Sequence, residues 1–306
     1  MIRRILYFFL LILFFGSFDS PETAPSFNIV LSDSVKFETV LRLDSLGLPD
    51  GYKASVLTPV CEADKCYAIE ILLNWDLIGR YQSFDTIPGQ PLTKLDHEPF
   101  IAEDYQKLHQ ILVNSNSALA SYKKEELVRD TRTSSIDGFT GATIREIKES
   151  VISGAVYSCY TLWHIANGPV VDSLQVTTRT VFSEALVQKL VGMGDQQVNY
   201  YIINTFSDED FSTYMTAVLT AIEEGKGYFA KNAIEKMPIE VINLEEAQFF
   251  FAKEFDRFNY FTQVALLEKL DGSQLTDSLE ISIKSHLDDR NSHKNELIRK
   301  LVEGQL

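Results

Sequence analysis

The sequence contains only three cysteines, which limits the metal and haem sites that it can form. Cys61 and Cys66 are close enough in sequence to close a small loop by a disulfide in an oxidising compartment. They could instead supply half of a metal site, but no second cysteine or histidine pair has zinc-like spacing. The Cys-x-x-Cys-His motif of covalent haem is absent. Cys159 falls on the apolar face of an expected helix, so we expect a buried thiol there.

Positive charge is scarce too. The chain carries 28 Lys and Arg residues against 43 Asp and Glu residues, which gives a formal net charge of −15 and a pI of about 4.8. Such a surface repels nucleic acid and anionic lipid headgroups. We therefore expect no nucleic-acid partner. An acidic surface suits instead a protein partner with a basic docking patch.

The signatures of common catalytic sites are missing as well. We find no phosphate-cradling P-loop, no Ser-His-Asp arrangement and no carboxylate pair at a convincing spacing. We therefore assign no catalytic residue and no metal ligand. Whether the protein is an enzyme stays open, and the sequence favours a redox carrier or accessory subunit over a stand-alone enzyme.

The apolar run near the amino terminus is also too short to span a membrane comfortably. Arg3 and Arg4 precede an apolar stretch over residues 5–15, which is too short for a typical span but is typical of a secretory signal. Small residues follow, yet neighbouring phenylalanines weaken a clean cleavage site. We expect residues 1–20 to be a signal peptide, with a retained anchor as the alternative. The protein would then be exported, either periplasmic or membrane-anchored and facing the periplasm.

The length of 306 residues and the hydrophobic fraction of 45% are enough for two folded domains. Apolar and alternating patterns predict strands over residues 27–31, 35–41, 67–75 and 80–84, the last two forming a hairpin around the turn 76–79. Apolar residues at helical spacing predict helices over residues 102–112 and 144–162, the second ending near 167–169, and a short helix at 124–128.

From about residue 180 the pattern becomes entirely helical. The helical patterns cover residues 181–206, 208–237, 244–270 and 274–303. They start roughly thirty residues apart, which is the spacing of helix-pair repeats. This spacing, though not the individual residues, resembles HEAT-type arrays. We therefore predict an all-α helical-repeat (HEAT-like) domain over residues 171–306.

The most specific motif is the string Asp-Gly-Phe-Thr-Gly-Ala-Thr at residues 137–143. Its glycines permit a tight turn, and Thr143 presents a hydroxyl at the start of an expected helix, where unpaired N–H groups and the helix dipole favour a phosphate. A capping box between Thr143 and Glu146 would explain the same residues without any cofactor.

The string matches the Asp-x-x-Thr-Gly-Ala-Thr motif, and so resembles the FMN-binding domains of sodium-pumping NADH:quinone reductase and Rnf electron-transfer complexes. The resemblance implies that Thr143 carries FMN through a phosphoester bond. The other motif positions are Asp137, Thr140, Gly141 and Ala142. Because the motif offers Thr143 only Asp137 as an activating base, attachment by a separate flavin transferase is favoured, as the resemblance also implies.

Two departures from that family bear on the flavin contacts. Arg145 stands where the family often shows a second hydroxyl residue, although a guanidinium is a favourable neighbour for a phosphate. The family's upstream loop corresponds only loosely to residues 96–99. His97 in that loop is a candidate contact to the flavin ring, and the alternative is a loop histidine bonded to Asp96 or Glu98.

Together these observations predict an α+β FMN-binding-type domain over residues 28–170, followed by the helical-repeat domain. The expected function is an exported electron-transfer protein with FMN covalently bound to Thr143. Its partners would be a flavin transferase and a redox protein, with a membrane-associated electron-transfer complex as the setting. The alternative is an exported interaction scaffold whose flavin-type domain binds no cofactor.

Overall fold

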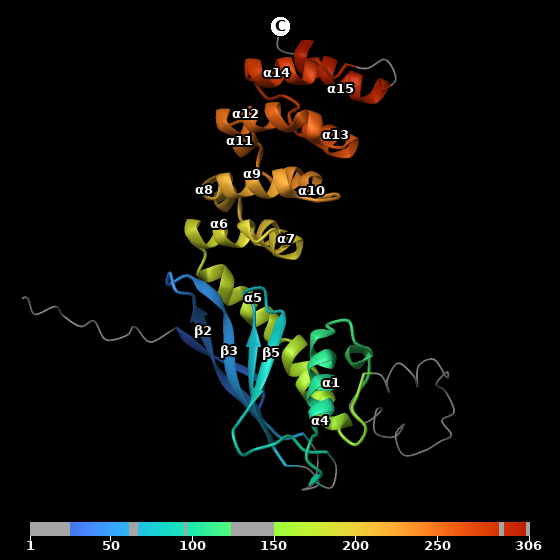
Figure 1. Ribbon diagram of the computed structural model, residues 1–306. Helices are drawn as coiled ribbons and strands as arrows, with labels where there is room; N and C mark the ends of the chain where they lie inside the picture. Colours follow the sequence, from blue (N-terminus) through green and yellow to red (C-terminus); the bar gives the residue numbers. More distant parts are fainter. Residues whose placement is uncertain (1–24, 61–66, 95–96, 124–149, 288–290, 304–306) are drawn as a thin grey trace, which may run out of the picture.

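The protein consists of an antiparallel five-stranded sheet followed by a mostly helical region (Figure 1). The computed structural model describes residues 25–60, 67–94, 97–123, 150–287 and 291–303. In Figure 1 the sheet and its neighbouring helices form one end of the molecule, and stacked helix pairs extend from it toward the carboxyl terminus. This arrangement confirms the predicted α+β region followed by an all-helical one.

The sheet is a simple meander in which each strand pairs antiparallel with the next along the chain. Its strands are β1 (Ser26–Ser32), β2 (Val35–Leu43), β3 (Pro49–Thr58), β4 (Ile69–Trp75) and β5 (Tyr81–Thr86). All four predicted strands are confirmed, including the hairpin. The sequence did not predict β3, because Pro49 and Gly51 at its start resemble a turn. Gly51 has a φ of 146°, and a Cβ there would collide with the Trp75 carbonyl oxygen.

Helices α1 (Ala102–Val113) and α4 (Val156–Asn167) lie side by side next to the sheet (Figure 1). The short helix η2 (Ala118–Ser121) follows α1 and packs against α4. The prediction for α1 is confirmed, and α4 ends where the sequence indicated.

The prediction that the second helix runs through residues 150–155 is wrong. Residues 150–155 form turns, and α4 begins only at Val156. Gly154 adopts a φ of 78°, outside the helical region, so no helix runs through it. Val151 and Ile152 are nevertheless buried, so their helical spacing reflects burial in a turn. Residues 144–149 and the predicted short helix at 124–128 lie outside the described residues.

Helix α5 (Val170–Thr180) connects the sheet to the helical region through buried hydrogen bonds. The Tyr52 hydroxyl and the Thr178 Oγ1 lie 2.7 Å apart, and Thr178 Oγ1 lies 2.5 Å from the Leu77 carbonyl oxygen. Among the described residues, the buried apolar side chains of the sheet and those of the helical region belong to one continuous cluster. The two regions therefore share a core.

Each predicted helical pattern forms two or three helices, and the successive groups stack on one another (Figure 1). The helices are α6 (Glu184–Gly192), α7 (Gln196–Thr205), α8 (Asp208–Thr213), α9 (Met215–Glu224), α10 (Phe229–Lys236), α11 (Ile239–Ile242), α12 (Glu245–Glu254), η3 (Phe255–Arg257), α13 (Tyr260–Lys269), α14 (Asp277–Lys284) and α15 (Ser292–Glu303). Side chains such as Asp195 and Ser207 cap individual helices. Across the described ranges, no helix is both long and apolar enough to cross a bilayer.

Hydrogen bonds between neighbouring pairs recur at similar sequence separations. Asn232 Nδ2 donates to the Tyr200 hydroxyl at 3.3 Å, and Ser282 Oγ donates to the Ala252 carbonyl at 2.8 Å. These partners lie 32 and 30 residues apart. The contacts agree with the predicted spacing of about thirty residues, because equivalent positions of adjacent helix pairs face each other.

Candidate functional site

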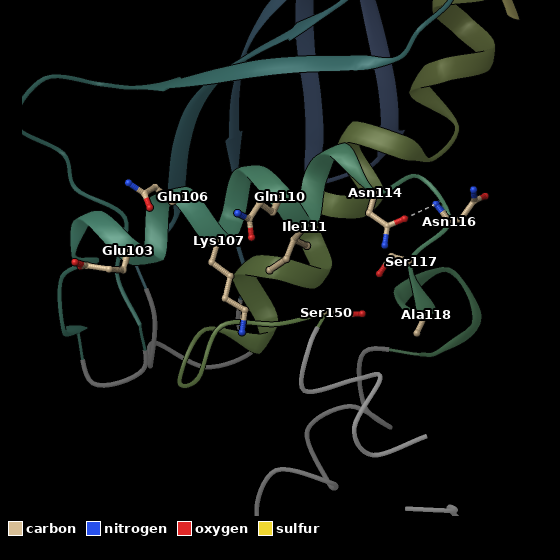
Figure 2. Close-up of a pocket in the computed structure, with 10 residues that line it drawn as sticks. All are labelled: Glu103, Gln106, Lys107, Gln110, Ile111, Asn114, Asn116, Ser117, Ala118 and Ser150. Atoms are coloured by element: carbon tan, nitrogen blue, oxygen red, sulfur yellow. Dashed lines mark hydrogen bonds between the residues drawn. The ribbon is translucent and has the colours of Figure 1, made fainter. Parts of the chain in front are cut away.

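The candidate site is a cavity beside the point where the motif segment joins the described structure. The motif residues themselves lie outside the described residues: Asp137, Thr140, Gly141, Ala142, Thr143 and Arg145. The described residues end at Lys123, shortly after η2, and begin again at Ser150. Ser150 lines a cavity of about 400 Å³ against α1 (Figure 2). We call this space the α1 cavity.

One face of α1 forms a wall of the α1 cavity. Its side chains follow the helix axis in Figure 2, because their spacing of three and four residues places them on one face. The α1 residues that line it are Glu103, Gln106, Lys107, Gln110 and Ile111. The other lining residues are Asn114, Asn116, Ser117, Ala118 and Ser150. This site was not predicted from the sequence. The sequence pattern that could have indicated it is the repetition of amide side chains, at helical spacing, on the exposed side of a predicted helix.

The rim of the α1 cavity is fixed to α4 by hydrogen bonds. Trp163 Nε1 donates to the Asn114 carbonyl at 2.9 Å, and Asn167 Nδ2 donates to the Leu112 carbonyl at 2.9 Å. The Ser117 hydroxyl accepts from the Leu119 N–H at 3.3 Å and so caps η2. These bonds satisfy carbonyl and N–H groups at helix ends, and they hold the cavity wall in a defined position.

The amino-terminal end of α1 is fixed by a partly buried ion pair. The Lys94 Nζ lies 2.8 Å from the Asp104 Oδ2, which also accepts the Ile101 N–H at 3.0 Å. Burial raises the pKa of Asp104, but the Lys94 ammonium and the Ile101 N–H outweigh this effect and lower the pKa overall. The charged form of Asp104 thus stabilises the helix start that positions the cavity wall.

We expect Asp104→Asn to lower the free energy of unfolding by about 1–2 kcal/mol at neutral pH, because Lys94 loses its partner. The pKa of Asp104 is lower in the folded protein than in the unfolded chain. Its contribution is therefore full above the unfolded pKa, about 3.9, and is lost as the pH falls through the folded pKa. Urea unfolding of the wild-type protein and of Asp104→Asn, at pH 7 and at acid pH, measures this difference in stability. The exposed neighbour variant Glu103→Gln should change little, and an Asp104→Asn effect that stays the same at acid pH would contradict the assignment.

His97 lies in a different environment from the α1 cavity. Its backbone φ is 66°, and its ring packs on Tyr67 with the ring centroids 4.0 Å apart. It is not among the residues that line the cavity. The described structure therefore does not bring His97 together with the polar face of α1.

Trp75 and Cys159 have structural roles. Trp75 is fully buried and donates from Nε1 to the Ala166 carbonyl at 2.8 Å, so its ring is not available for stacking on a ligand. Cys159 is buried as expected, and burial raises the pKa of its thiol to about 12. Cys61 and Cys66 lie outside the described residues. Within those residues, no group of three or more His, Cys, Asp or Glu side chains could hold a metal ion.

Comparison of the chain with protein-family models, with curated proteins and with solved structures finds no match. The motif string and the geometry of the described residues are therefore the grounds for assigning a function.

Proposed function

We propose that the protein is an exported electron carrier of the FMN-binding type, with FMN attached through its phosphate to Thr143. The observation that carries the proposal is the string 137–143, which agrees with the flavinylation motif at every specified position. A bound flavin would accept and donate electrons, and the protein would bind and orient it. The helical array would position the carrier against a redox partner.

The reach of the chain supports a role for the α1 cavity. Only residues 144–149 separate Thr143 from Ser150, which lines the cavity. A fully extended chain of this length spans at most about 25 Å, so a group on Thr143 stays near the cavity. The cavity volume of about 400 Å³ falls within the usual range of small-molecule sites.

The side chains of the α1 cavity suit the polar edge of a flavin ring. Gln106, Gln110 and Asn114 each carry an amide that both donates and accepts hydrogen bonds. Such groups complement the carbonyl and N–H groups of the ring. Lys107 on the same face contributes positive charge, which favours electron uptake by a bound flavin. We therefore propose that these residues would hold the ring.

Thr143→Ala should abolish covalent flavin completely, because it removes the only oxygen to which the phosphate is proposed to bond. The measurement is intact-protein mass spectrometry after co-expression with a flavin transferase. Wild-type protein and the control Thr133→Ala, which changes a threonine of the same segment outside the motif, should both gain the mass of one attached FMN. Wild-type protein without this gain, or Thr143→Ala protein with it, would contradict the proposal. Circular dichroism verifies that each variant is folded.

The exposed aromatic residues of the helical array favour a second candidate, an exported interaction scaffold without flavin. Tyr228 and Phe261 are each more than half exposed, and their ring centroids lie 5.9 Å apart. Exposed aromatic residues are common at protein interfaces. A yellow protein whose chromophore survives denaturation supports the carrier, and a colourless protein from a host with the transferase supports the scaffold.

A further inference from the structure

A second cavity lies at the end of the sheet, between the β1–β2 turn, the end of β3 and α4. Its volume is about 630 Å³. Val30 and Val35 line it from the first two strands, Pro59 from just after β3, and Tyr160 and Ile165 from α4. We call it the α4 cavity. It shares no lining residue with the α1 cavity.

The chemistry of the α4 cavity is unusual for this chain because it lacks formal charge. Among the described residues that line it, none is Asp, Glu, Lys or Arg, although 23% of the whole chain is charged. The polar lining residues are Ser32, Ser34, Thr58, Tyr160, Thr161 and His164. A charged ligand would lose its hydration there without gaining an opposite charge, which disfavours its binding.

His164 gives the cavity an aromatic wall and one hydrogen-bond acceptor. Its ring lies 4.2 Å from the Tyr160 ring, centroid to centroid. Its Nε2 lies 3.1 Å from the Leu119 carbonyl oxygen, which only accepts, so Nε2 carries the proton. Nδ1 is then a hydrogen-bond acceptor. Burial lowers the pKa of His164 and so favours the neutral form of the ring.

We infer that the α4 cavity binds an uncharged, mostly apolar small molecule that contains a ring and a hydrogen-bond donor. The volume lies in the usual range of small-molecule sites, which combine apolar walls with a few polar groups. The apolar side chains would bury the ring, and the His164 Nδ1 would accept its hydrogen bond. This site goes beyond the flavin proposal and does not depend on Thr143.

The probe for this site is 2-naphthol, an uncharged ring compound with one hydroxyl donor. Fluorescence titration of the full chain should show saturable binding at one site. The matched anion 2-naphthoate should bind at least about tenfold more weakly, because its carboxylate finds no cation in the cavity. Saturation that is absent up to millimolar probe, or equal affinity for the two probes, would overturn the inference.

Two variants place the binding in the α4 cavity. Val30→Trp should fill the edge of the cavity and weaken 2-naphthol binding at least about tenfold. Leu57→Trp is the matched control, because Leu57 is 60% exposed on β3 and outside the cavity, while Val30 is 62% exposed. It should leave the affinity unchanged within about twofold. Equal affinities of the two variants for 2-naphthol would overturn the assignment of binding to the α4 cavity.

His164→Phe tests the acceptor separately from the shape of the cavity. The variant keeps an aromatic ring beside Tyr160 but removes Nδ1, so the affinity for 2-naphthol should fall about fivefold. The affinity for naphthalene, which has no donor, should not fall. Equal losses for the two compounds would contradict the hydrogen bond. Thermal unfolding of each variant separates weaker binding from a damaged fold.

Discussion

Trp75→Ala should lower the free energy of unfolding by about 3–5 kcal/mol, the range observed when a large buried aromatic side chain is removed. Trp75 is fully buried at the end of β4. Its indole packs in the shared core and donates to the Ala166 carbonyl of α4 at 2.8 Å. The substitution therefore creates a cavity and also removes a bond between the sheet and α4.

Urea unfolding followed by far-ultraviolet circular dichroism measures this effect. Trp75→Phe separates the loss of packing from the loss of the hydrogen bond. Phenylalanine keeps most of the ring volume but leaves the Ala166 carbonyl without its donor, at a cost of about 1–3 kcal/mol. Phe249→Ala is the control, because Phe249 is 65% exposed and should change stability by no more than about 0.5 kcal/mol. A Trp75→Ala loss as small as the control's would show that the sheet and α4 do not depend on this contact.

Thr178→Val should lower the free energy of unfolding by about 2–4 kcal/mol, because it removes the hydroxyl between two buried polar groups. Thr178 is fully buried on α5, and its Oγ1 lies within hydrogen-bond distance of the Tyr52 hydroxyl and the Leu77 carbonyl. Valine has nearly the same shape, so the loss reports the hydrogen bonds and not packing. Burial raises the pKa of Tyr52 to about 12, although the Thr178 bond acts in the opposite direction.

A double-mutant cycle with Tyr52→Phe assigns the loss to this junction. The two substitutions together should cost less than the sum of their separate effects, because both remove the same bond. Thr180→Val is the matched control on α5, where the threonine is exposed, and it should change stability by no more than about 0.5 kcal/mol. Strict additivity of Thr178→Val and Tyr52→Phe would contradict a shared hydrogen bond.

Local patterns were sufficient to predict most of the secondary structure. The helical patterns at 181–206 and 208–237, for example, correspond to α6–α7 and α8–α10. Their boundaries follow from side chains such as Asp195, which caps α7. Such features predict well because spacing and capping depend on residues within one or two turns of each other.

The prediction was wrong or incomplete where distant contacts override local preference. Val151 and Ile152 have helical spacing, yet they are buried in a turn that leads to α4. The segment 49–58 begins like a turn, yet β2 and β4 pair with it on both sides as the central strand of the sheet. In both segments the neighbours that decide the conformation are remote in the sequence.

The sequence by itself determined the class of each region, the repeat spacing of the helices and the net negative charge, and it supplied the motif behind the proposal for Thr143. Each of these depends on composition, on short-range periodicity or on a contiguous string. Only the tertiary structure decided which amides of α1 line one cavity, how burial lowers the pKa of His164, and how α5 joins two regions through Thr178. These features arise between residues up to 126 positions apart. Their energies come from burial and from the pairing of polar groups in the packed core.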